Sequence, residues 1–108
     1  MINVYTDGAC APTNPGPAGY AVVAVFPDKS VTTFSECFYR STNNRMELMA
    51  AIKAIELFAP AGPVHIYTDS MYVAYPVSSG KLKRKTEEQI LKKPNPDLWV
   101  IMQSPLLS

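Results

Sequence analysis

Two β-rich runs in this chain end in the same Tyr-Thr-Asp triplet, and this repetition constrains the fold more than any other feature. The first triplet ends at Asp7 and the second at Asp69, while a third acid, Glu47, lies in another polar context between them. A carboxylate at the tip of a buried strand is costly unless its charge is offset. Because like charges repel, converging acids are harder still to keep ionised. A divalent cation would offset them, so the sequence predicts a hard-metal site with oxygen ligands.

Hydrophobic periodicity and Pro/Gly punctuation predict an alternation of strands and helices. The long helix is the clearest element, with apolar residues at helical spacing, Thr42, Asn43 or Asn44 as its N-cap, and Pro60 at its end. The other predicted elements are strands at 2–6, 20–26, 31–39 and 64–68, a loop at 8–19, a short helix at 71–75, a basic helix at 82–93 and a last helical piece at 97–103.

The order of these elements predicts where the acids meet. Three consecutive strands indicate an antiparallel meander, and the strand after the long helix pairs parallel with an earlier strand through a right-handed crossover. If that partner is the first strand, Asp7 and Asp69 lie side by side at one carboxyl edge, and Glu47 reaches the same spot from the crossover helix. The predicted class is α/β with a mixed sheet and flanking helices, in a single domain over residues 1–108.

Each acid also has a structural interpretation. Asp7 and Asp69 could close turns or cap a helix, and Glu47 falls three residues after Asn44, where it could complete a capping box. The convergence of all three favours the metal, and carboxylate-held metals usually meet phosphate. With two ions, one activates a water and the other stabilises the leaving oxygen. His65 lies inside a predicted strand, so we interpret it as a packed or exposed strand residue.

Charge and cysteine content narrow the function classes. The net charge of +1 excludes a polycation, but residues 81–93 hold six basic residues against two acidic ones. That cluster suits an anionic polymer, with a solvated helix face as the alternative. Cys10 and Cys37 lack metal-type spacing, which predicts a reduced, cytoplasmic protein. We expect no signal peptide and no membrane partner, because no apolar run approaches the length of a membrane-spanning helix.

Five segments carry a resemblance to type 1 ribonuclease H. They are Tyr-Thr-Asp-Gly-Ala at 5–9, Asn-Pro-Gly-Pro-Ala-Gly-Tyr at 14–20, Thr-Asn-Asn-Arg-Met-Glu-Leu-Met-Ala-Ala at 42–51, Ile-Tyr-Thr-Asp-Ser-Met-Tyr-Val at 66–73 and Pro-Asn-Pro-Asp-Leu-Trp at 94–99. They follow the family's order and nearly its spacing. The resemblance implies a ribonuclease H-like fold and endonucleolytic cleavage of the RNA strand of RNA–DNA hybrids with Mg²⁺ or Mn²⁺. It matches Asp7, Glu47 and Asp69 to three of the family's four catalytic carboxylates.

The resemblance also implies further contacts. The backbone of Gly8 joins the three carboxylates at the metal, and amide and backbone groups can recognise the 2′-hydroxyls of the RNA strand. A basic protrusion adds salt-dependent affinity for the nucleic-acid backbone. The implied residues are Gly8, Asn14, Asn43 and Asn44 for the RNA strand, Arg40, Thr42 and Asn95 for a phosphate of the DNA strand, and Lys81, Lys83, Arg84 and Lys85 in the basic protrusion at 81–93.

The resemblance stops after Trp99, and residues 100–108 diverge. No acid follows Asp97, which matches a non-catalytic position, so the family's fourth carboxylate, last strand and last helix have no counterpart. We therefore expect weak activity, with Mn²⁺ a better activator than Mg²⁺. We also expect an exposed sheet edge beside the 64–68 strand, on which a dimer could form although the family is monomeric.

Two other functions compete with the nuclease. One is a non-catalytic module that binds hybrid or double-stranded nucleic acid, which the lack of a fourth acid favours. The other is an integrase or resolvase core of the wider polynucleotidyl-transferase superfamily. The motifs at 14–17 and 42–47 argue against that second alternative.

Overall fold

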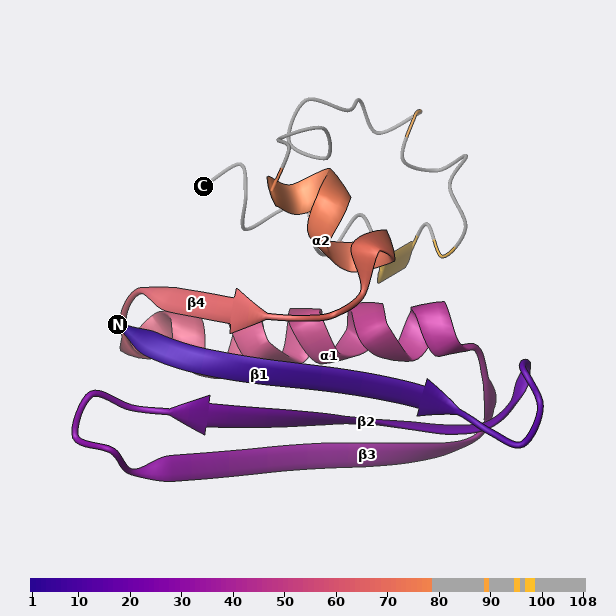
Figure 1. Ribbon diagram of the computed structural model, residues 1–108, viewed down its shortest axis with the longest axis horizontal. Helices are drawn as coiled ribbons and strands as arrows, with labels where there is room; N and C mark the ends of the chain where they lie inside the picture. The colour runs from indigo at the N-terminus through magenta and orange to yellow at the C-terminus, as the bar shows by residue number, and fades with distance from the viewer. Residues whose placement is uncertain (79–88, 90–94, 96, 99–108) are drawn as a thin grey trace.

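The computed structural model describes residues 1–78, 89, 95, 97 and 98 (Figure 1). The predicted basic helix at 82–93 falls outside this set, apart from the isolated residue Gln89. The divergent tail at 100–108 also lies outside it, as do the four predicted basic contacts Lys81, Lys83, Arg84 and Lys85. Of the last predicted helical piece, Asp97 and Leu98 are described and are helical. None of the described helices is long and apolar enough to cross a bilayer.

A four-stranded mixed sheet with one long helix on one face forms the body of the protein (Figure 1). The strand order is β3-β2-β1-β4: β1 pairs antiparallel with β2 and parallel with β4, and β2 pairs antiparallel with β3. The predicted meander and the parallel partner are therefore confirmed. The elements are β1 (Ile2–Cys10), β2 (Gly16–Val25), β3 (Val31–Ser41), α1 (Asn43–Phe58), a 3₁₀ turn η1 (Ala59–Ala61), β4 (Val64–Tyr67) and α2 (Met71–Ser78).

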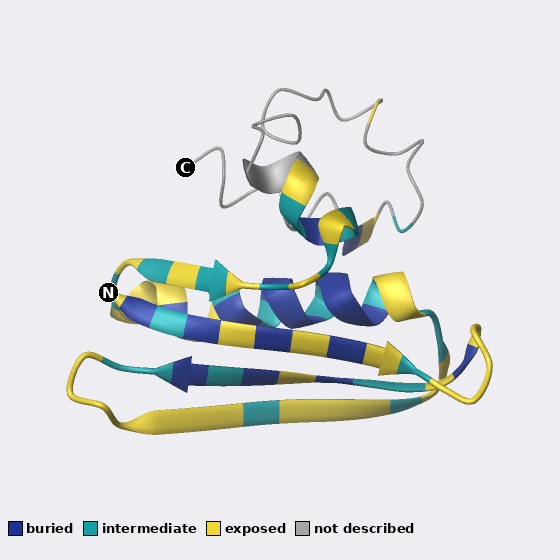
Figure 2. Cartoon of the chain, in the orientation of Figure 1, coloured by how far each residue is buried: buried dark blue, intermediate teal, exposed yellow. Residues whose placement is uncertain are grey.

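The main core lies between the sheet and α1. Alternate residues of β1 and β2 are buried, as expected of strands with one covered face (Figure 2). On α1 the matching residues recur every fourth position, which places them on one stripe of the helix. The core cluster comprises Ile2, Val4, Tyr20, Val22, Ala24, Met46, Ala50, Ala54 and Phe58.

A second apolar cluster fixes the later elements on another flank of α1. Leu48, Ala51 and Ile52 of α1 pack with Val73 of α2 and with Leu98, all of them buried. This packing holds α2 and the helical turn at 97–98 against the same helix that carries Glu47. Two regions far apart in sequence therefore share one support.

The first hairpin is longer than the sequence predicted. The loop expected at 8–19 is confined to 11–15, because Gly8, Ala9 and Cys10 pair with Tyr20, Gly19 and Ala18. Antiparallel pairing satisfies backbone groups that a loop would leave to solvent, so it continues as far as the prolines allow. A register shift between β2 and β3 accommodates Pro17, which has no N–H to donate.

The helix boundaries differ less from the prediction. Thr42 is the N-cap of α1 among the three candidates, with its hydroxyl accepting a hydrogen bond from the N–H of Arg45. The short helix predicted at 71–75 continues to Ser78 as α2. Pro76 therefore does not end the helix, because a proline removes one backbone donor without preventing the following residues from being helical.

Candidate functional site

The three predicted acids converge. One carboxylate oxygen from each of Asp7, Glu47 and Asp69 can be chosen so that all three atoms lie within 4.8 Å of one another. Asp7 comes from β1, Glu47 from α1 and Asp69 from the segment between β4 and α2. This is the only cluster of potential metal ligands among the residues that the structure describes. The predicted convergence is therefore confirmed.

The sequence predicted that Asp7 lies at the tip of the first strand. In the structure Asp7 lies inside β1, which continues to Cys10. It pairs with Ala21 of β2 on one side, but the pairing of β1 with β4 ends at Tyr5 and Tyr67. Beyond that point β4 no longer borders β1, and Asp69 follows two residues after β4 ends. The end of β4 therefore creates the open edge at which the acids meet.

Glu47 is the buried member of the cluster, with 4% of its surface exposed, whereas Asp7 and Asp69 are exposed. One of its carboxylate oxygens accepts a hydrogen bond from the N–H of Gly8, and the other accepts one from the hydroxyl of Thr68 at 3.4 Å. Burial raises the pKa of Glu47, the negative charges of Asp69 and Asp7 raise it further, and the bond from Gly8 partly counteracts them. A bound cation would stabilise the ionised form of this group.

Gly8 permits the close approach of α1 to β1. A Cβ atom there would lie 2.5 Å from the backbone N of Glu47 and 2.6 Å from the carbonyl carbon of Met46, closer than real side chains come. The absence of a side chain lets the strand backbone donate directly to the Glu47 carboxylate. The N–H of Gly8 thus orients the Glu47 carboxylate, while the place of Gly8 in a metal site stays a prediction.

A cavity of about 400 Å³ adjoins the exposed side of the cluster. Asp7, Thr68 and Asp69 line it together with Tyr5 and Tyr67, whose rings stack with centroids 4.8 Å apart. His65 lies in β4, is exposed and stacks on Tyr67. The interpretation of this histidine as a strand residue is confirmed.

Several residues that the resemblance assigned to the RNA strand gather at the start of α1. The side-chain oxygen of Asn14 accepts a hydrogen bond from the N–H of Asn43 at 3.1 Å, although the two residues are 29 positions apart. Asn44 is exposed in the same turn. Gly8 contacts α1 a few residues further along, at Met46 and Glu47. The role of these four residues in binding RNA stays a prediction.

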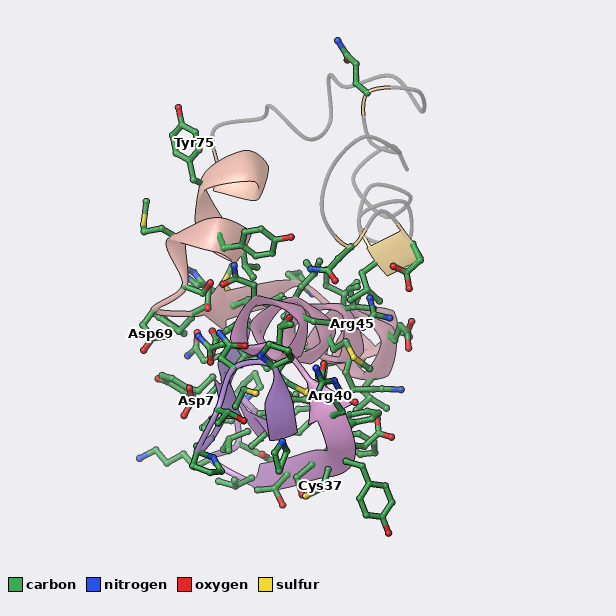
Figure 3. All side chains as sticks on the ribbon, turned by 90° about the vertical axis from the view of Figure 1, so that its right-hand side faces the viewer. Asp7, Cys37, Arg40, Arg45, Asp69 and Tyr75 are labelled. Carbon is green, nitrogen blue, oxygen red and sulfur yellow. The ribbon has the colours of Figure 1, made fainter. Side chains whose placement is uncertain are left out.

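The residues assigned to the DNA phosphate are only partly brought together. Arg40 is exposed near the end of β3. Thr42 and Asn95 both hydrogen-bond to Arg45, Thr42 through the backbone N–H of Arg45 and Asn95 through its guanidinium at 3.2 Å. In the end-on view of Figure 3, Asp7 and Asp69 lie on one side of α1, and Arg40 and Arg45 lie on the other.

Arg45 and Thr68 are site residues that the sequence analysis missed. Both lie inside recognised motifs, directly beside residues that were selected, and this adjacency was the only signal. Thr68 hydrogen-bonds to Glu47, and its hydroxyl also accepts from the N–H of Ser70 at 3.1 Å. Arg45 forms a bidentate ion pair with Asp97, at 3.1 and 2.8 Å. Glu47 and Asp97, the partners of Thr68 and Arg45, are distant from them in sequence, so only the folded chain shows these two contacts.

Comparison with known proteins relates nearly the whole chain to one protein family. The RNase H family model matches residues 1–105. Ribonuclease H of Cyanothece sp. is 45% identical over 94% of this chain, and ribonuclease HI of Synechocystis sp. is 39% identical over 94%. The chain spans 68% and 66% of the lengths of these two relatives.

Solved structures share the same fold. LC11-RNase H1 in complex with an RNA/DNA hybrid superposes with a TM-score of 0.72 at 26% identity, covering 98% of this chain and 75% of that one. The N-terminal RNase H domain of a Mycobacterium tuberculosis protein gives a TM-score of 0.70 at 28% identity, covering 95% and 71%. The predicted ribonuclease H-like fold is confirmed.

Proposed function

The chain belongs to the ribonuclease H family, and from this premise we propose that it hydrolyses the RNA strand of RNA–DNA hybrids with a divalent ion bound by Asp7, Glu47 and Asp69. The observation that carries the proposal is the 4.8 Å convergence of the three carboxylates. Carboxylate oxygens are the ligands that Mg²⁺ and Mn²⁺ prefer, so the donor set fits either ion. The three oxygens, within 4.8 Å of one another, would hold such an ion after side-chain rotations that bring them closer together.

The three carboxylates have different tasks in this scheme. Glu47 is buried and held from two sides by Gly8 and Thr68, so it supplies the fixed ligand. Asp7 and Asp69 are exposed beside the cavity, where they hold the ion and leave room for substrate oxygens. A bound divalent ion supplies a polarised water and stabilises charge on the phosphate oxygens. The cluster contains no Cys or His, which agrees with direct attack by water on phosphorus.

The proposed substrate follows from the two groups of residues that flank α1. Asn14, Asn43 and Asn44 present amide groups able to bind 2′-hydroxyls on the RNA strand. Thr42 and Asn95 each hydrogen-bond to Arg45 in the first turn of α1, and their polar side chains are suited to a phosphate of the other strand. The hybrid bound to the related LC11-RNase H1 supports this class of substrate. A cytoplasmic location also belongs to the proposal, supported by the two free thiols Cys10 and Cys37.

Cleavage of a labelled hybrid tests the proposal. The protein is incubated with hybrid, double-stranded RNA or double-stranded DNA in Mg²⁺, Mn²⁺ or EDTA, beside Asp7→Asn. The control is Asp28→Asn, which removes the same charge from an exposed turn where Asp28 bonds Ser30. We expect metal-dependent cleavage of RNA in the hybrid only. Asp7→Asn should lower the rate by more than about 100-fold, because loss of metal-site groups typically costs at least this much, and Asp28→Asn should not.

Two outcomes would contradict the nuclease. Hybrid binding without cleavage in either metal would leave a non-catalytic binding module as the function. Equal cleavage by the wild-type protein and Asp7→Asn would show that the carboxylate cluster does not carry the reaction.

A further inference from the structure

We propose that Arg45 is a positioning residue, an inference that rests on the proposed function. Arg45 and Asp97 form a joint that holds Asn95 against the start of α1, and this position of Asn95 determines how it contacts a phosphate of the nucleic acid. The joint connects parts of the chain that are 50 and 52 residues apart. One side is the first turn of α1, two residues before Glu47, and the other is the segment that contains Asn95, Asp97 and Leu98.

The guanidinium of Arg45 holds this segment at three points. Its Nη1 donates to Oδ1 of Asn95 at 3.2 Å and to Oδ1 of Asp97 at 3.1 Å, and its Nη2 donates to Oδ2 of Asp97 at 2.8 Å. The planar fork of an arginine suits such bidentate geometry, which a lysine cannot reproduce. The backbone N–H of Arg45 meanwhile donates to the hydroxyl of Thr42 at 3.2 Å. Arg45 therefore contacts Thr42 through its backbone and Asn95 through its side chain.

Asn95 is constrained on its other sides as well. Its φ of 55° lies in the left-handed region, which asparagine adopts more readily than most residues, and its carbonyl accepts from the N–H of Leu98 at 3.1 Å. Leu98 is buried in the second core cluster and anchors the segment. The side-chain amide of Asn95 donates to the hydroxyl of Tyr72 at 3.2 Å. An amide nitrogen carries two donors, so the described contacts leave a second one for a phosphate oxygen.

The joint fixes the position of Asn95, but it adds little to the folding stability of the protein or to the positive charge of its surface. The side chains of Arg45 and Asp97 are 34% and 58% exposed, and exposed ion pairs add little to folding stability. The charge of Arg45 is paired with Asp97, so the pair adds almost no net positive potential. This distinguishes Arg45 from a residue that itself binds a phosphate, since such a residue releases counterions and steepens the salt dependence of binding.

Three variants test the joint in the full chain. Arg45→Lys keeps the charge and loses the fork, and the double variant Arg45→Met with Asp97→Asn removes both charges without changing the net charge. Glu56→Gln is the matched control, because it breaks the 3.5 Å ion pair with Lys53 on the same helix, outside the joint. The measurements are the dissociation constant for a hybrid in Ca²⁺ at several salt concentrations, KM and kcat in Mn²⁺, and the NMR resonances of the Asn95 side-chain amide.

We expect Arg45→Lys to raise KM and the dissociation constant about tenfold, the effect of losing one charge-assisted hydrogen bond, with kcat within about twofold. The Asn95 amide resonances should shift in both joint variants and remain unchanged in Glu56→Gln. The salt dependence of binding should have the same slope in all proteins.

Three results would overturn the inference. The first is that Arg45→Lys has the KM of the wild-type protein and that its Asn95 amide resonances do not shift. Another is a lower kcat with unchanged KM, which indicates only a loss of folded protein. The third is a salt slope lower by about 0.9 in the double variant, which would make Arg45 a phosphate contact itself. Failure of the wild-type protein to bind hybrid would instead refute the proposed function, while the Asn95 resonances would still report whether the joint exists.

Discussion

Gly8→Ala is the substitution that most directly tests how the site is built. The added Cβ would lie 2.5 Å from the backbone N of Glu47, 2.6 Å from the carbonyl carbon of Met46 and 2.9 Å from its Cβ. None of these atoms is the end of a flexible side chain, so the strain cannot be relieved by a rotamer change. Ordinary contacts need about 3.5 Å, so α1 must move away from β1 by roughly 1 Å.

The expected cost has two parts. Overpacking of this kind typically costs about 1–3 kcal/mol. Moving the helix also breaks or lengthens the hydrogen bond from Gly8 to the Glu47 carboxylate, and a bond to a charged group contributes about 1.5–3 kcal/mol. We expect a loss of roughly 3–5 kcal/mol in the free energy of unfolding. For a domain of this size that corresponds to a fall in Tm of more than about 10 °C.

The assay compares thermal unfolding and Mn²⁺ binding with those of Gly19→Ala. In that control the nearest atoms to the new Cβ are the carbonyl oxygen of Glu36 at 3.0 Å, Sγ of Cys37 at 3.6 Å and Cα of Cys37 at 3.8 Å, and the stability should change by less than about 1 kcal/mol. Both variants reduce the entropy of the unfolded chain equally, so the difference isolates the contact with α1. Equal Tm values for the two variants, with normal Mn²⁺ affinity in Gly8→Ala, would show that the site does not depend on the close approach of α1 to β1 at Gly8.

Two further predictions concern Glu47 and Thr42, the N-cap of α1. Glu47→Gln should raise the Tm of the metal-free protein at neutral pH and abolish its stabilisation by Mn²⁺. Because the pKa of Glu47 is raised in the folded state, the metal-free wild-type protein should lose stability as pH rises through that pKa, and a pH-independent gap between the two proteins would contradict this. Thr42→Val removes the N-cap acceptor and should lower the free energy of unfolding by about 1 kcal/mol in urea. An unchanged urea midpoint would show that the Thr42 hydroxyl does not stabilise α1.

Much of the site could be predicted because its main determinants are local. The periodic apolar residues of α1 and the Tyr-Thr-Asp ends of two runs indicate which segments fold together and where their charges lie. The handedness of the crossover then allows few arrangements, and in the observed one Asp7 and Asp69 share an edge. The sequence left Thr42, Asn43 and Asn44 open as N-caps, and the structure shows that Thr42 occupies this position.

The length of the first hairpin escaped prediction. Prolines and glycines between residues 12 and 19 have the composition of a long loop, yet the strands pair to Cys10 and Ala18. Local composition sets the conformational preference of a segment, whereas strand pairing depends on whether a partner strand lies alongside that segment. That partner exists only once the meander has formed.

Periodicity and chain connectivity were enough to predict the order of the elements as far as α2, the buried stripe of α1 and the identity of the three converging acids. The hydrogen bond from Gly8 to Glu47 and the contacts of Arg45 with Asn95 and Asp97 are visible only in the folded protein. They join residues 39 to 52 positions apart, which meet only after the sheet register and helix packing are set. No local pattern in the sequence records the ångström-scale spacing on which those hydrogen bonds depend.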